Sequence, residues 1–128
     1  MKLLLDTHVL LWAAGHPERL SSEAHLLINH PEHSLYFSAA SLWEITIKLG
    51  LERADFQVNP RLLRQGLLEN GYHELSISSL HALAVAQLPP IHKDPFDRLL
   101  IAQAHVEGML LLSADTLVAQ YGDSVKKI

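Results

Sequence analysis

Four acidic residues, far apart along the chain, stand where an α/β protein gathers ligand-binding side chains. Asp6 directly follows the apolar run 2–5, and Asp115 comes just after the apolar run 109–112. Glu44 lies inside one predicted helix, and Asp97 lies in the first turn of another. Two unit charges about 4 Å apart repel by roughly 4 kcal/mol at an effective dielectric constant near 20. A group of carboxylates at one place therefore indicates a bound cation.

The chain has no cysteine, so the ligands available in this set are carboxylate oxygens. Oxygen ligands favour a hard divalent ion such as Mg²⁺ or Mn²⁺. Such an ion polarises a phosphoryl oxygen and activates water for attack on phosphorus. The residues thus predict hydrolysis of a phosphodiester, with the four acids as metal ligands.

Each acid also has a purely structural interpretation. Asp6 is suited to cap the helix that follows it, and Asp115 is typical of a turn. Glu44 and Lys48 have the i, i+4 spacing, in the favoured order, of a surface ion pair. Asp97 stands in a first helical turn, where an acid interacts favourably with the helix dipole. Composition and spacing leave these alternatives open.

Short apolar runs alternate with longer stretches of helical periodicity. The runs predict strands at 2–5, 35–38, 74–77, 109–112 and 125–128. The periodic stretches predict helices at 9–14, about 21–30, 39–50, 60–70, 78–87, 94–108 and 114–121. Strands that are apolar on both faces and alternate with helices predict a three-layer α/β/α fold with a central parallel sheet of four to five strands. In such sheets ligands bind at the carboxyl ends of the strands, where these acids lie.

The composition bounds the class of protein. With 128 residues, 48% of them hydrophobic, the chain is expected to form a single domain over 1–128. A net charge of -4 argues against a general nucleic-acid coat protein, which must neutralise many phosphates. The lack of cysteine suits a reducing cytoplasm, and no apolar segment is long enough to cross a membrane.

Four short motifs, spread across the chain in order, resemble those of one family. They are LLLDTH at 3–8, SLWEITIK at 41–48, HKDPFDRLLIAQA at 92–104 and LLSAD at 111–115. The family is that of the PIN domains, and within it the VapC-type toxins of bacterial toxin–antitoxin pairs. The third motif is the most specific, and the order and spacing of all four make the resemblance strong.

The resemblance implies a metal-dependent ribonuclease, with its acidic centre on Asp6, Glu44, Asp97 and Asp115. It also implies a homodimer and inhibition by a small cognate antitoxin. A hydroxyl residue near the fourth acid assists the site in similar proteins, which assigns that role to Ser113. Thr7 is a weaker candidate of the same kind. Apolar surface between residues 9 and 28 is where we expect a partner helix to dock.

Several residues near the motifs have open roles. Lys93 and Arg98 are candidates for contacts with RNA phosphates, although Arg98 is equally suited to pair with an acid. Asp94 is placed to cap the helix after it. His8 and His92 lie beside acidic motifs, but hydrogen-bonded or surface histidines are the more common case. The aromatic residues Trp12, Tyr36, Trp43 and Phe96 are expected in the core, with no role in RNA binding.

Two other classes of function remain as alternatives. One is a catalytically inactive binding module with the PIN fold. The other is an Asp-based phosphoryl-transfer domain, which also places an aspartate after its first strand. The dehalogenase type of phosphatase needs a second aspartate two positions later, and that position here is His8. The acidic pair expected of a signalling receiver is not found either.

Overall fold

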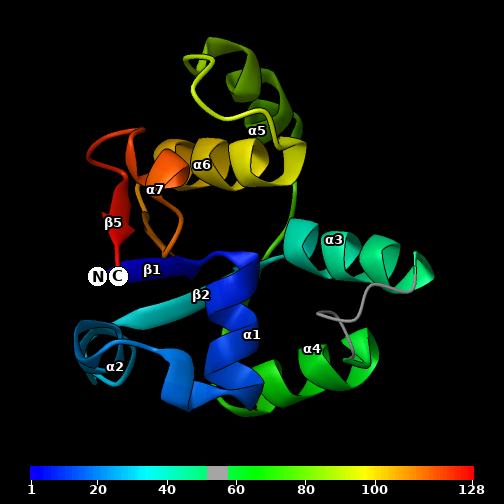
Figure 1. Cartoon of the computed structure of the whole chain (residues 1–128), viewed down its shortest axis with the longest axis vertical. Coiled ribbons are helices and arrows are strands. Elements are labelled where there is room, and N and C mark those ends of the chain that lie inside the picture. The colour runs from blue at the N-terminus through cyan, green and yellow to red at the C-terminus, as the bar shows by residue number, and fades with distance from the viewer. Residues whose placement is uncertain (52–57) are drawn as a thin grey trace.

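The computed structural model describes residues 1–51 and 58–128, and its centre is one parallel β-sheet (Figure 1). The strands are β1 (Lys2–Leu5), β2 (Ser34–Ser38), β3 (His73–Leu75), β4 (Leu110–Ser113) and β5 (Val125–Lys127). Their order across the sheet is β3-β2-β1-β4-β5, and every pair of neighbours is parallel. The predicted parallel sheet of four to five strands is confirmed.

The central strand β1 is enclosed on both faces. Leu3 pairs in register with Leu35 of β2 and Leu110 of β4. Leu3, Leu4 and Leu5 are fully buried, which is why this strand is a continuous apolar run and not an alternating one.

Helices cover the sheet on both sides (Figure 1). They are α1 (Thr7–Gly15), α2 (Ser22–Ile28), α3 (Ala39–Gly50), α4 (Pro60–Glu69), α5 (Ser79–Ala84), α6 (Pro95–Glu107) and α7 (Thr116–Ala119), with short 3-10 turns η1 (Pro17–Arg19) and η2 (Val85–Gln87). One core packs α1, α2 and α4 against Leu3 and Leu5 of β1, with Ile45 of α3. The other packs α6 and α7 against Leu4 and Leu111. The expected three-layer architecture is confirmed.

The topology gathers residues 6, 38 and 113 at one edge of the sheet. They stand at the carboxyl ends of β1, β2 and β4, which are neighbours. The connection after β1 leads to β2 on one side, whereas β4 lies on the other side of β1. Ligands bind at such a switch point in open α/β sheets. The backbone N–H of Asp6 donates to the Leu112 carbonyl over 3.1 Å, which holds the carboxyl ends of β1 and β4 together.

Several boundaries differ from those predicted. The strand expected at 74–77 is His73–Leu75, at the edge of the sheet, and the helix expected at 114–121 is only Thr116–Ala119. The helix expected at 9–14 begins earlier, at Thr7, because the Asp6 side chain caps it. Trp43 was expected in the core, but its side chain is 57% exposed and packs edge-on against Phe96. Within the described ranges, no helix has the length and apolar character to cross a membrane.

Candidate active site

Asp6 is a buried carboxylate at the end of β1. It is 6% exposed, and its Oδ1 accepts a hydrogen bond from the backbone N–H of Val9 over 2.9 Å. Burial raises the pKa of this carboxyl to about 6, and the charges of Glu44 and Asp115 act in the same direction, while a hydrogen bond with Ser113 lowers it. The predicted helix cap is confirmed, yet it uses only part of this carboxylate.

Glu44 lies in the first half of α3, and two side chains hold its carboxylate. Its Oε1 accepts from the Thr7 hydroxyl and its Oε2 from Lys48 Nζ, both over 2.6 Å. The Ser41 hydroxyl lies 3.0 Å from the same Thr7 oxygen. The i, i+4 ion pair therefore forms, but it is not an ordinary surface pair because Glu44 is only 3% exposed.

Asp97 lies in the first turn of α6, facing the other acids. Burial raises its pKa to about 6, with further upward contributions from the charges of Asp94, Asp6 and Glu44. A hydrogen bond with His92 lowers it. The charges of Asp6 and Glu44 act on this carboxyl, so acids that are far apart in the sequence lie close together in the fold.

Ser113 links the first acid to the fourth. It is fully buried at the end of β4, hydrogen-bonds with Asp6, and accepts from the backbone N–H of Asp115 over 3.1 Å. Asp115 caps α7, its Oδ1 accepting from Leu117 N over 2.7 Å, while its Oδ2 lies 3.8 Å from His92 Nε2. The structure thus brings together Asp6, Glu44, Asp97, Asp115 and Ser113, the five predicted site residues.

The donor set fits a hard divalent cation. Its oxygens come from several carboxylates: burial is the main cause of the raised pKa of Asp6 and of Asp97, and repulsion from neighbouring acids adds to it. A cation between them would relieve this repulsion. One side-chain atom from each of Asp97, Asp115 and His92 lies within 4.8 Å of the others, so the two carboxylates are close enough to share one ion.

The flanking residues have distinct roles. Asp94 caps α6 by accepting from Asp97 N over 2.9 Å, as expected. Arg98 pairs with no acid among the described contacts, and its guanidinium donates to carbonyls of the 85–92 segment and to Tyr121. Lys93 is exposed. Sequence reasoning missed Ser41 and underrated Thr7 and His92, whose only signal was their place inside the motifs.

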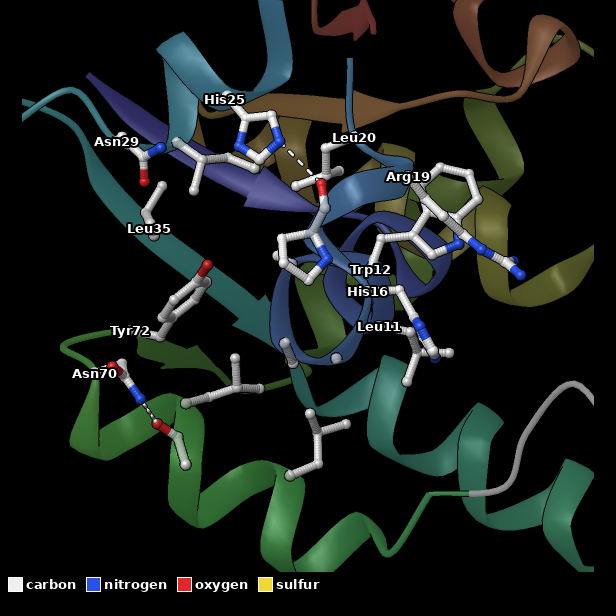
Figure 2. A pocket seen from close by; sticks show the side chains of 18 of the residues that line it. Leu11, Trp12, His16, Arg19, Leu20, His25, Asn29, Leu35, Asn70 and Tyr72 are labelled. Atoms are coloured by element: carbon white, nitrogen blue, oxygen red, sulfur yellow. Dashed lines mark hydrogen bonds between the residues drawn. The ribbon is translucent and has the colours of Figure 1, made fainter. Parts of the chain in front are cut away.

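A separate hollow of about 1420 Å³ lies on the α1, α2 and α4 side of the sheet (Figure 2). Leu11, Trp12, Leu20, Leu35 and Tyr72 line it, together with polar side chains such as His25 and Asn70. None of the five predicted site residues is among its described lining residues. The hollow is therefore a different surface from the acidic centre, although His8 lies at its margin.

Comparison with known proteins identifies the family. The PIN domain model matches residues 3–123, and this chain belongs to the PIN domain family. It is 33% identical over 113 residues to Ribonuclease VapC22 of Mycobacterium tuberculosis, covering 88% of this chain and 86% of that protein.

Solved structures share the fold. A chain of VapBC2 from Rickettsia felis, solved with a DNA fragment from its promoter, has a TM-score of 0.72 at 13% identity and covers 99% of this chain and 98% of that one. A chain of VapBC-1 from nontypeable Haemophilus influenzae has a TM-score of 0.65 at 16% identity, covering 100% and 97%. At these identities the likeness establishes the fold alone.

Proposed function

We propose that this protein is a metal-dependent endoribonuclease and the toxin of a toxin–antitoxin pair. The observation that carries the proposal is the convergence of Asp6, Glu44, Asp97 and Asp115 at the switch point of a PIN-family sheet. The similarity of this chain to Ribonuclease VapC22 supports RNA as the substrate.

In this proposal the four acids together hold Mg²⁺ or Mn²⁺. Asp6 and Asp97 supply carboxylate oxygens to the ion, with Asp115 beside them. Glu44 completes the negative field and is oriented by Thr7 and Lys48. When bound, the ion polarises a phosphoryl oxygen of RNA and activates water for attack. Ser113 hydrogen-bonds with Asp6 and with the Asp115 backbone, and so fixes their relative positions.

The alternatives have less support. An Asp-based phosphatase would use the side chain two residues after Asp6, but His8 is exposed there and its ring lies 6.2 Å from that of Trp12. A binding module without activity has no use for a buried and a partly buried carboxyl whose pKa values are both raised from 3.8 to about 6. Such groups cluster at sites that do chemistry.

RNA cleavage by the purified protein, free of antitoxin, tests the proposal. We expect cleavage of single-stranded RNA with Mg²⁺ or Mn²⁺, none in excess EDTA, and a loss of at least about 100-fold in Asp6→Asn and Asp97→Asn. Asp123→Asn, at an exposed position in the turn before β5, is the matched control and should retain full activity. Cleavage that persists in EDTA or in either site variant would contradict the proposed site.

We further propose that the hollow of Figure 2 binds a helix of the antitoxin. It lies within the expected docking region on α1 and α2, extends to α4, and combines apolar with polar lining. Leu62 of α4 lines it and is 65% exposed. Leu62→Glu should weaken antitoxin binding, measured by calorimetry, while RNA cleavage stays unchanged. Unchanged antitoxin affinity would place the partner elsewhere.

The homodimer is also part of the proposal. Leu80 and Leu83 of α5 are 66% and 71% exposed, and side chains of this kind are often covered by a second subunit. Light scattering should give twice the mass of 14.3 kDa for the wild type and a monomer for Leu83→Glu. A monomeric wild type would refute it.

A further inference from the structure

His92 reaches the acidic centre from the loop that precedes α6. Its Nε2 lies 2.8 Å from Asp97 Oδ2 and 3.8 Å from Asp115 Oδ2. The side chain is only 16% exposed. The His92 ring is therefore largely buried within the site and does not lie on the open surface.

The other ring nitrogen determines what Nε2 can do. The backbone N–H of Lys93 donates to His92 Nδ1 over 3.1 Å. A nitrogen that accepts a hydrogen bond carries no proton, so in the neutral ring the proton is on Nε2. In this orientation Nε2 is a donor toward Asp97 and not a lone pair for a metal.

The backbone of His92 is fixed by two side chains. Its N–H donates to the Tyr121 hydroxyl oxygen over 2.8 Å, and Arg98 Nη1 donates to its carbonyl over 3.3 Å. The two anchors also contact each other, with Arg98 Nη1 3.1 Å from the Tyr121 oxygen. The Tyr121 hydroxyl in turn donates to the Pro89 carbonyl. These contacts hold the loop in the position that presents the imidazole to the acids.

We propose that His92 is a positioning residue of the metal site, whose Nε2–H fixes Asp97 Oδ2 so that the second oxygen of that carboxylate serves the cation. The inference rests on the proposed function, since it requires Asp97 to bind the metal. Hydrogen-bond partners of metal ligands commonly contribute about 10- to 100-fold in metal affinity.

Mn²⁺ binding, followed by electron paramagnetic resonance, tests the role without relying on activity. His92→Leu removes the donor and should weaken Mn²⁺ binding by about 10-fold or more. His92→Gln keeps an N–H donor at a similar reach and should stay within about 3-fold of wild type. His105→Leu, at an exposed position in the last turn of α6, is the control and should bind as wild type does.

A second variant acts through the loop that carries the histidine. Tyr121→Phe removes the acceptor that holds the His92 backbone and should weaken Mn²⁺ binding in the wild-type background but not further in His92→Leu. Additive losses would contradict the proposed linkage. If the leucine variant folds poorly, Tyr121→Phe in the wild-type background keeps the inference testable, since unchanged Mn²⁺ binding in that variant would contradict it.

The outcomes separate the inference from the function on which it rests. Wild-type affinity in His92→Leu would overturn the positioning role while leaving the nuclease proposal intact. A directly coordinated nitrogen in pulsed spectra of the wild type, lost in His92→Gln, would overturn it in favour of a ligand role. A wild type that binds no Mn²⁺ would contradict the proposed function itself, and the inference with it.

Discussion

The Thr7 hydroxyl donates to Glu44 Oε1 over 2.6 Å, and this bond joins the first residue of α1 to the buried acid of α3. Thr7 directly follows Asp6, so the bond fixes the acid after β1 relative to the acid after β2. The two helices also share one hydrophobic core, which contains Val9 of α1 and Ile45 of α3. The hydroxyl is therefore a structural determinant of the site's geometry.

Thr7→Val should lower the free energy of unfolding by about 1.5–3 kcal/mol, because a buried carboxylate loses a hydrogen-bond donor. Thr7→Ser keeps the hydroxyl and should lose less than half as much. Urea unfolding of both variants measures the difference. Equal losses in the two would mean that the methyl group, and not the hydroxyl, stabilises this contact.

Lys48→Met should destabilise the protein by about 2–3 kcal/mol, because Glu44 keeps its charge in a buried position without the ammonium partner. Lys48 is 21% exposed, so the loss is smaller than for a fully buried pair. The double variant Glu44→Gln/Lys48→Met should lose less than the sum of the single variants, since no unpaired charge remains. Additive losses in a double-mutant cycle would refute coupling between the two side chains.

Without metal, stability should fall as the pH rises from about 4 to about 7. The pKa values of Asp6 and Asp97 are raised from 3.8 to about 6, so in this range the folded state binds more protons than the unfolded state. For Asp6, the more buried of the two, the loss is about 3 kcal/mol. Thermal unfolding in EDTA across this range measures the slope.

Asp6→Asn is the matched control for the pH dependence. Asparagine also caps a helix, so the variant keeps the bond to Val9 N but removes the charge. It should flatten the slope and be more stable than wild type at pH 7.5. A slope identical to that of wild type would mean that Asp6 titrates normally in the folded protein.

Arg98→Lys should destabilise the protein by about 3 kcal/mol, because a lysine cannot reproduce the forked contacts with the Pro89, His92 and Val85 carbonyls. Lys93→Met, at an exposed position, should change stability by less than about 0.5 kcal/mol and instead raise KM for RNA. Urea unfolding and cleavage kinetics on both variants separate the two cations. An Arg98→Lys protein of normal stability would restore the phosphate-binding interpretation of Arg98.

The sequence predicted the parallel sheet because its central strands are unbroken apolar runs, as in Leu3 to Leu5. It was less accurate at the edge of the sheet, where β3 is short and carries His73 and Glu74 as exposed residues. Edge strands bury few side chains, so the pattern of apolar residues does not define where such a strand begins and ends. The assignment of residues 1–128 to a single domain stays a prediction.

Asp6, Asp97 and Asp115 were found because acids stand just after strands or in a first helical turn, whereas Glu44 was found inside a helix, through its motif. Their hydrogen-bond partners were not, since contacts such as Thr7 with Glu44 or His92 with Asp97 depend on how separate elements pack. The role of Arg98 was likewise not predictable from the sequence. Charge suggested a phosphate contact, whereas the fold surrounds the guanidinium with carbonyl groups.

The most direct test of the account is anomalous diffraction from crystals soaked in Mn²⁺, because it locates the ion itself. We expect one or two anomalous peaks in contact with the carboxylates of Asp6 and Asp97, near Asp115. No peak among these acids at millimolar Mn²⁺, or a peak bound only elsewhere on the protein, would contradict the metal-dependent site from which the proposed nuclease activity follows.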